Sequence, residues 1–238
     1  EYRRIRGRAG LAEIVADPAL CAEVTLQPVR RLGVDAAILF ADILLVPDAL
    51  GQSVRFAEGE GPLLEPLRTA QDFARLSPTA TRPKFERVFE TVQRLRQDLP
   101  DETSLIGFCG APWTVATYMI EGRGSKDQAA ARLLAYRDPA GFQQLMDLLV
   151  ETSIEYLSGQ VQAGADALQI FDTWAGSLPD DQFEKWVIEP TRRMVEAMHE
   201  RHPDVPRIAL TATADPGRSP RVAGPPGTAA TGAGRTRP

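Results

Sequence analysis

The stretch from Ala36 to Gly51 reads AAILFADILLVPDALG, and it decides how we expect the rest of the chain to fold. Six apolar or small residues, 36–41, come first, then the carboxylate of Asp42, then three more apolar residues, 43–45. A run of this length and composition is typical of a strand that is buried on both faces.

The carboxylate of Asp42 needs an explanation, because an unpaired charge in an apolar environment is costly. In one interpretation, nearby backbone N–H groups or an arginine satisfy it. In the other, a bound ligand supplies the hydrogen-bond donors. The run by itself favours the first interpretation, and the motifs further along the chain favour the second.

Composition limits the class of protein. The 238 residues are enough for one large domain, and a hydrophobic share of 43% is ordinary for a globular protein. A net charge of −5 argues against a nucleic-acid partner. We see no apolar run near the roughly 20 residues that a membrane helix needs. Two cysteines without metal or redox spacing suit a reducing compartment, so we expect a cytoplasmic protein.

Strand and helix patterns alternate along the chain. Helices are expected at 17–31, 82–99, 127–136, 139–163 and 180–201. The first has Asp17 as its N-cap and Gly33 as its stop, and the last is interrupted at Pro190. Strands are expected at 36–45, 104–109, 167–171 and from 205, with a turn at 46–51 and a polar loop at 52–61.

This alternation predicts parallel strands joined by helices, in a (β/α) barrel or a doubly wound sheet. Both folds bind ligands at the carboxyl ends of the strands. Asp42, Tyr118 and Thr173 are all expected just beyond such ends, so one site could contain them. We interpret residues 1–210 as the folded unit. Residues 211–238 are rich in Gly, Pro, Ala and Arg and too poor in apolar side chains to order themselves, so we expect a disordered tail.

Four segments carry a resemblance to a known family. GFCGAPWTVATYMIEG at 107–122 strongly resembles the signature of the uroporphyrinogen decarboxylases. FADILLVPDALG, ending at Gly51, resembles the segment that holds the family's essential aspartate. LQIFDTWAG at 168–176 resembles the segment with its small hydroxyl residue, and EYRRIRGRAG at 1–10 resembles the stretch after its Arg-Gln-Ala-Gly-Arg motif. The resemblance covers about residues 1–209.

The resemblance implies a distorted (β/α)8 TIM-type barrel that is usually a homodimer. It implies an enzyme that needs no cofactor and removes CO2 from the four acetate side chains of uroporphyrinogen, giving coproporphyrinogen in haem biosynthesis. Asp42 then matches the essential aspartate, and Tyr118 and Thr173 match two substrate-contacting positions. Arg6 lies where some members have a further substrate arginine. No metal site is implied.

The chemistry that the resemblance implies accounts for the buried acid. Loss of CO2 from an sp3 carbon needs an electron acceptor, and a pyrrole protonated on a ring carbon is one. A fixed anion near the ring nitrogens stabilises the resulting positive charge. The four pyrrole N–H groups of a domed macrocycle can converge on one carboxylate, which would satisfy Asp42.

Other interpretations of the same residues stay open. Tyr118 could be a partly buried ring with a satisfied hydroxyl, and Thr173 a turn cap. Asp172 is expected to be structural, and Pro112 and Trp113 are expected to shape the strand end.

The resemblance also implies parts that we do not find. The Arg-Gln-Ala-Gly-Arg loop would precede Glu1, and a C-terminal segment with a substrate-contacting histidine has no counterpart, so we expect an incomplete barrel. An inactive remnant that binds tetrapyrrole or pairs with a full-length subunit is therefore an alternative. A corrinoid-dependent methyltransferase of the same superfamily is another, but its zinc site needs His and Cys ligands, whereas His199 and His202 share one helix and Cys109 stands apart.

Overall fold

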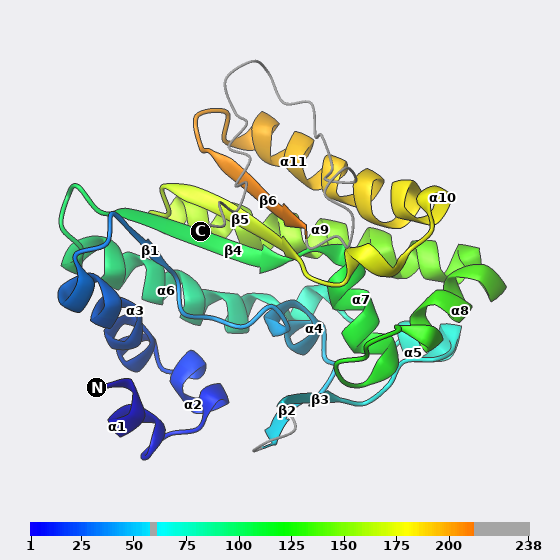
Figure 1. The fold of residues 1–238 in the computed structure, drawn as a ribbon, viewed down its shortest axis with the longest axis horizontal. Coiled ribbons are helices and arrows are strands. Elements are labelled where there is room, and N and C mark those ends of the chain that lie inside the picture. Colours follow the sequence, from blue (N-terminus) through cyan, green and yellow to red (C-terminus); the bar gives the residue numbers. More distant parts are fainter. Residues whose placement is uncertain (58–60, 212–238) are drawn as a thin grey trace, which may run out of the picture.

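The centre of the computed structural model, which describes residues 1–57 and 61–211, is a parallel sheet of four strands in the order β1-β4-β5-β6 (Figure 1). The strand bounds are β1 Ala36–Ile38, β4 Ser104–Gly110, β5 Ala167–Asp172 and β6 Arg207–Thr211. The predicted α/β class with parallel strands is confirmed. In the described part of the chain, β1 and β6 are the two edges of the sheet, so the barrel is not closed.

Helices make up most of the remaining structure. Their bounds are α1 Tyr2–Arg6, α2 Leu11–Ala16, α3 Pro18–Leu32, α4 Leu45–Ala49, α5 Ala70–Phe73, α6 Arg82–Asp98, α7 Pro112–Glu121, α8 Ala129–Arg137, α9 Pro139–Ala163, α10 Asp180–Phe183 and α11 Glu189–Arg201. Short helical turns are η1 Pro78–Ala80, η2 Ala175–Ser177 and the π-helical η3 Glu184–Ile188. A separate antiparallel hairpin consists of β2 Val54–Ala57 and β3 Gly61–Leu64.

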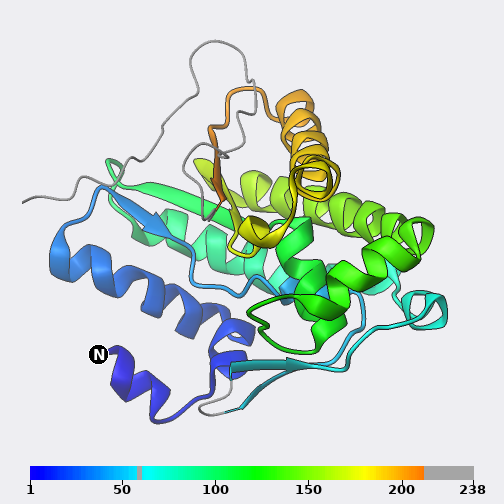
Figure 2. The same cartoon turned by 45° about the vertical axis from the view of Figure 1, so that its right-hand side comes forward.

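The two faces of the sheet differ in how well they are covered. Helices α3, α6, α9 and α11 pack side by side in that order along one face (Figure 2). Strand residues that point towards them, such as Leu105, Cys109 and Ile170, are almost completely buried. On the opposite face, in barrel terms the interior, Ile38 is 49% exposed and Leu210 is 51% exposed. The hydrophobic core therefore lies between the sheet and its helices.

The predicted start and end of α3 are confirmed. Asp17 Oδ1 accepts hydrogen bonds from the backbone N–H groups of Ala19 and Leu20, at 2.9 and 3.1 Å, and Pro18 occupies the first helical position. The helix ends at Gly33, whose φ of 60° is in the left-handed region. Local sequence thus fixes both ends of the helix that leads into β1.

The longer predicted helices are also confirmed. The helices predicted at 82–99 and 139–163 are α6 and α9, and the latter has the predicted bounds. The interruption predicted at Pro190 is the π-helical turn η3, which ends two residues earlier. Pro190 has no N–H to offer the carbonyl of Trp186, four residues before it, so the regular ladder is broken there.

Three local predictions around the key stretch are wrong. The strand predicted through 36–45 is β1, which ends at Ile38. The turn predicted at 46–51 is the short helix α4, because a helical turn buries Val46 and Ala49 in the core. The loop predicted at 52–61 contains the whole of β2 and the first residue of β3.

The segment predicted to be a disordered tail, 211–238, lies outside the described residues except for Thr211, which ends β6. The structure gives none of the described helices the length and apolar character needed to cross a membrane.

Candidate functional site

The candidate site lies at the carboxyl ends of β1, β4 and β5, where a pocket of about 390 Å³ opens on the less covered face of the sheet. Among the described residues, Thr173 is the one hydroxyl-bearing residue that lines it; the apolar ones are Ile38, Leu39, Phe40, Ala41, Ile43, Phe108 and Phe171. Phe108 and Phe171 meet edge to face, with ring centroids 5.3 Å apart. Asp42 does not line this pocket itself, but both of its chain neighbours do.

Asp42 lies in the loop between β1 and α4, not within a strand as the apolar run predicted. Its side chain is partly buried, and its Oδ1 accepts one hydrogen bond, from the backbone N–H of Leu44 at 2.7 Å. No ion pair within the described residues includes it. Burial raises the pKa of Asp42, and the Leu44 N–H opposes that rise. The described residues therefore leave most of the hydrogen-bonding capacity of this carboxylate open.

The loop that carries Asp42 is tied to α3 through Phe40. Cys21 Sγ donates to the carbonyl of Phe40 at 2.6 Å, and Thr25 Oγ1 accepts from the N–H of Phe40 at 3.0 Å. Cys21 and Thr25 are four residues apart on a helix, so they lie on one face of it. Both backbone groups of Phe40 are thus satisfied by side chains, which fixes the loop two residues before the acid.

Gln160 of α9 supports the same region from behind. Where β1 leaves the sheet, Gln160 Oε1 accepts from the N–H of Phe108 at 2.9 Å and Nε2 donates to its carbonyl at 3.0 Å. These two hydrogen bonds replace those that a continuing strand would make. Gly107 allows this approach, because a Cβ there would lie 2.5 Å from Gln160 Oε1. The early end of β1 therefore leaves no unpaired buried backbone at Phe108.

Thr173 follows β5 directly, and its side chain is exposed. The residues on either side of it bind the same hydroxyl group, that of Thr114 in α7. Thr114 Oγ1 donates to Asp172 Oδ1 at 2.6 Å and accepts from the backbone N–H of Trp174 at 3.0 Å. Asp172 therefore bonds to a side chain of the protein, and its expected structural role stays a prediction.

The Asp172 carboxyl is buried, and its Oδ2 has no hydrogen-bond partner among the described residues. Burial raises the pKa of Asp172 to about 6, while the hydroxyl and N–H of Thr114 oppose the rise. Because Thr114 is the third residue of α7, the acid also lies at the positive end of that helix dipole.

Tyr118 lies inside α7, not beyond a strand end as predicted. Its half-buried ring faces that of Trp174, with centroids 6.2 Å apart. Trp174 is the residue after Thr173, so the structure brings Tyr118 close to the β5 end through this ring contact. No hydrogen bond or ion pair in the described part of the chain joins Tyr118 to Asp42.

Arg6, the fourth predicted residue, lies exposed in α1, where its Nη1 donates to the carbonyl of Ala9 at 3.3 Å. It forms no hydrogen bond or ion pair with Asp42, Tyr118 or Thr173 in the described structure. Its helix is nonetheless near the site, because the Tyr2 and Phe40 rings meet at 5.9 Å. Its predicted role in binding the substrate stays a prediction.

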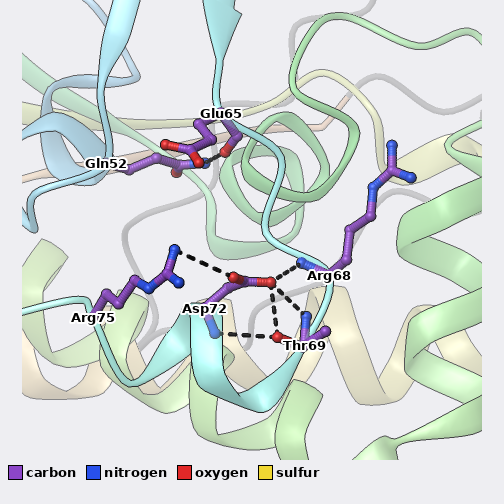
Figure 3. Close-up of polar contacts among 6 residues, drawn as sticks. All are labelled: Gln52, Glu65, Arg68, Thr69, Asp72 and Arg75. Atoms are coloured by element: carbon purple, nitrogen blue, oxygen red, sulfur yellow. Dashed lines mark hydrogen bonds and ion pairs between the residues drawn. The ribbon is translucent and has the colours of Figure 1, made fainter.

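The segment after the hairpin bonds to the C-terminal end of α7 through the N–H groups of Leu64 and Leu67, and Figure 3 shows the contact of Gln52 with this segment at Glu65. Gln52 Nε2 donates to the carbonyls of Glu65 and Met119, at 2.7 and 3.0 Å, and thereby joins this segment to the residue after Tyr118. Further along, Asp72 accepts from the N–H groups of Arg68 and Thr69 and closes the turn that begins α5 (Figure 3). Sequence reasoning missed the contact between Gln52 and Met119, because the two residues are far apart along the chain.

The comparisons with known proteins agree with the motifs. The family model described as uroporphyrinogen decarboxylase matches residues 1–215. A uroporphyrinogen decarboxylase from Rhizorhabdus wittichii is 49% identical over 99% of this chain and 68% of its own length. Those from Mesorhizobium japonicum and Rhodospirillum rubrum are 55% and 51% identical, over 88% of this chain and 61% of their own length.

The chain therefore spans 61–68% of the length of these curated relatives. Among solved structures, a methyltransferase from Methanosarcina mazei matches with a TM-score of 0.66 and 18% identity, covering 88% of this chain and 60% of its own. At that identity the likeness supports the fold alone. The family match over residues 1–215 and relatives at about half identity lead to one conclusion: the chain belongs to the uroporphyrinogen decarboxylase family.

Proposed function

We propose that the chain decarboxylates uroporphyrinogen III without a cofactor, removing CO2 from its four acetate side chains to give coproporphyrinogen III. One observation carries the proposal. A partly buried carboxylate, Asp42, lies at the carboxyl end of a parallel sheet with one hydrogen bond and no ion pair among the described residues. An acid left in this state needs donors, and a tetrapyrrole has four N–H groups that can converge on one point.

The reaction needs an acceptor for the electron pair of the C–C bond that breaks. Protonation of the ring carbon next to the one that bears the acetate makes the ring a conjugated cation, and the electron pair of the C–C bond moves into that ring as CO2 leaves. A proton then adds to the former methylene carbon, and the ring carbon releases its own proton. In balance, CH2COO⁻ and one proton become CH3 and CO2.

Asp42 acts on the charge that develops in this sequence. A fixed anion near the pyrrole nitrogens stabilises the cationic ring, and the attraction is stronger in an apolar cleft than in water. The pyrrole N–H groups also donate to the acceptor positions of Asp42 that the described residues leave unbonded. Burial raises the pKa of this acid and so favours its neutral form. Hydrogen bonds from the N–H groups of the substrate have the opposite effect and favour the ionised form that the reaction needs.

Three further residues complete the proposed site. The Tyr118 and Thr173 hydroxyls bind acetate or propionate oxygens and fix the orientation of the macrocycle. Thr173 has the exposed position and the pocket that this role requires. Arg6 binds a substrate carboxylate from α1, whose Tyr2 packs on the loop that leads to Asp42.

We also propose that two copies of the chain form a homodimer, as the family resemblance implies, and that the enzyme works in the cytoplasm, as its two cysteines without metal or redox spacing indicate. Light scattering after size-exclusion chromatography distinguishes one 26.0 kDa chain from two. A monomer over the whole working concentration range would contradict the dimer.

One alternative has an observation in its favour. The chain spans 61–68% of the length of its relatives, so it could bind the tetrapyrrole without completing turnover. In that case the pocket and Asp42 keep their binding role, but no CO2 is released.

A direct assay separates the two functions. The chain is incubated anaerobically with uroporphyrinogen III, the products are oxidised to porphyrins, and the porphyrins are separated by number of carboxylates. We expect porphyrins that have lost one to four carboxylates. Saturable binding of uroporphyrinogen with no such product would establish the binding-only alternative and overturn the proposed activity.

A further inference from the structure

The Thr114 clamp consists of Thr114, Asp172 and Trp174, and it joins α7 to the end of β5. The hydroxyl of Thr114 is a donor to Asp172 Oδ1 at 2.6 Å and an acceptor from Trp174 N–H at 3.0 Å. Asp172 and Trp174 are the two neighbours of Thr173. One hydroxyl group therefore holds the chain on both sides of a proposed substrate-binding residue.

Both polar backbone groups of Trp174, its N–H and its carbonyl, form hydrogen bonds. Its carbonyl accepts from Trp113 Nε1 at 3.2 Å and from Ser177 Oγ at 3.2 Å, in addition to the N–H bond to Thr114. Its ring lies against Tyr118, one helical turn after Thr114 on α7. Through these contacts the clamp fixes where Thr173 lies relative to Tyr118, although the two residues are 55 positions apart in the chain.

We propose that Thr114 is a positioning residue that sets the distance between Thr173 and Tyr118, so that both bind carboxylate side chains of one tetrapyrrole. The inference rests on the proposed function and extends it to a residue that does not contact the substrate. Thr114 is completely buried, so its role is exercised through its two partners.

The chemistry of the position explains why a hydroxyl is needed. A single hydroxyl oxygen donates one hydrogen bond and accepts others, which neither an alkyl nor a carboxylate group can do. Valine has nearly the same shape and would remove the hydroxyl's hydrogen bonds to Asp172 Oδ1 and to the N–H of Trp174. Asp172 Oδ2 already has no partner among the described residues, so without the hydroxyl the backbone N–H of Thr114 would be the one donor that these residues still offer the acid.

The chain offers matched variants for the test. Thr114→Val removes both hydrogen bonds, and Thr114→Ser keeps them. Thr117→Val is the control, because Thr117 is equally buried in the same helix and its hydroxyl donates only to the carbonyl of Thr114, at 2.7 Å. Each variant is first checked by circular dichroism and thermal unfolding.

The first measurement is kcat/KM for uroporphyrinogen III. We expect Thr114→Val to lower it by about tenfold or more, and Thr114→Ser and Thr117→Val to stay within about twofold of wild type. Hydrogen exchange of residues 172–177 should be faster in Thr114→Val alone. An equal loss in Thr117→Val, or an unchanged value in Thr114→Val, would overturn the positioning role.

A double-mutant cycle with Thr173→Ala tests whether Thr114 acts through Thr173. In the Thr173→Ala background, Thr114→Val should cost much less than in wild type, because the group it positions is gone. Fully additive effects mean that Thr114 supports the fold only, and the proposal fails. If Thr114→Val does not fold, Thr114→Ala is taken through the same cycle with the same two outcomes.

The cycle can be measured without turnover. Quenching of tryptophan fluorescence by coproporphyrinogen III gives an affinity for each variant, and the same non-additivity is expected there. Wild-type chain that binds no tetrapyrrole overturns the proposed function itself. Wild-type chain that binds with additive variant effects overturns only the role of Thr114.

Discussion

The Asp42 carboxylate and the Leu44 N–H are joined by a hydrogen bond of 2.7 Å, the only one that the described part of the chain gives this acid. The two residues belong to the same loop, so the bond orients Oδ1 within the loop and leaves Oδ2 for another partner. A structural acid in an apolar setting is normally satisfied by the protein. Within the described residues Asp42 has a single donor, and its partly exposed carboxylate can take further donors from a bound ligand, which supports a role in binding and catalysis.

Replacement of the acid tests that role. Asp42→Asn keeps the size and an acceptor for the Leu44 N–H but removes the negative charge, so we expect kcat/KM to fall by about 100-fold or more. Circular dichroism should be unchanged. The control is Asp48→Asn in the following helix, whose carboxylate pairs with Lys84 Nζ at 2.6 Å. Asp42→Asn with the activity of the control would contradict the proposed mechanism.

The ionisation of Asp42 can be followed without an assay of activity. Because burial raises its pKa, we expect the 13C signal of its carboxyl carbon to titrate with a midpoint above 3.8 in the free chain. Assignment comes from the signal that disappears in Asp42→Asn. Bound coproporphyrinogen should lower the midpoint, because pyrrole N–H donors favour the ionised form. A midpoint that does not move when the ligand binds would contradict contact between this acid and the macrocycle.

Asp172 should make the stability of the chain depend on pH. Its pKa is about 6 in the folded state and close to 3.8 when unfolded, so the folded state binds more protons between these values. Its contribution to the free energy of unfolding is therefore complete below pH 3.8 and is lost as the pH rises through about 6. Relative to Asp172→Asn, wild type should lose about 3 kcal/mol over that window.

Urea unfolding of both proteins at several pH values from 3.5 to 7.5 measures this difference. Comparison with Asp172→Asn removes the contribution of all other titrating groups. A constant difference between the two proteins would mean that Asp172 titrates at its ordinary pKa in the folded state.

Gln160 is expected to matter more for stability than its exposed neighbour on the same helix. Gln160→Leu leaves the N–H and C=O of Phe108 buried without partners, which should lower the free energy of unfolding by about 2–4 kcal/mol. The matched control is Gln162→Leu, two residues later on the exposed side of α9. Equal unfolding midpoints for the two variants would show that water or another group satisfies Phe108.

The two cysteines should be unreactive in the folded chain. Cys21 and Cys109 are 2% and 1% exposed, and burial raises the pKa of Cys21 to about 12 and that of Cys109 further. Reaction with dithiobis-nitrobenzoate should therefore be very slow in native buffer and should give two thiols in urea. A thiol that reacts within seconds in native buffer would contradict the burial of that residue.

Several features followed from the sequence by itself because their causes are local. Asp17, Pro18 and Gly33 fix the ends of α3 through bonds and dihedral angles within a few residues. The apolar stripe between Pro139 and Ala163 predicted α9 with its observed bounds. The motifs around Asp42, Tyr118 and Thr173 also identified the family, since they are short and contiguous.

Tertiary structure alone decided how these residues come together. The strand predicted through 36–45 ends at Ile38, because Gln160, more than a hundred residues later, takes over the hydrogen bonds of β4 at Phe108. The hydroxyl that holds both neighbours of Thr173 comes from Thr114, on another helix. Sequence patterns report local backbone preference and burial, whereas such bonds join groups that only become neighbours once the sheet and helices have packed.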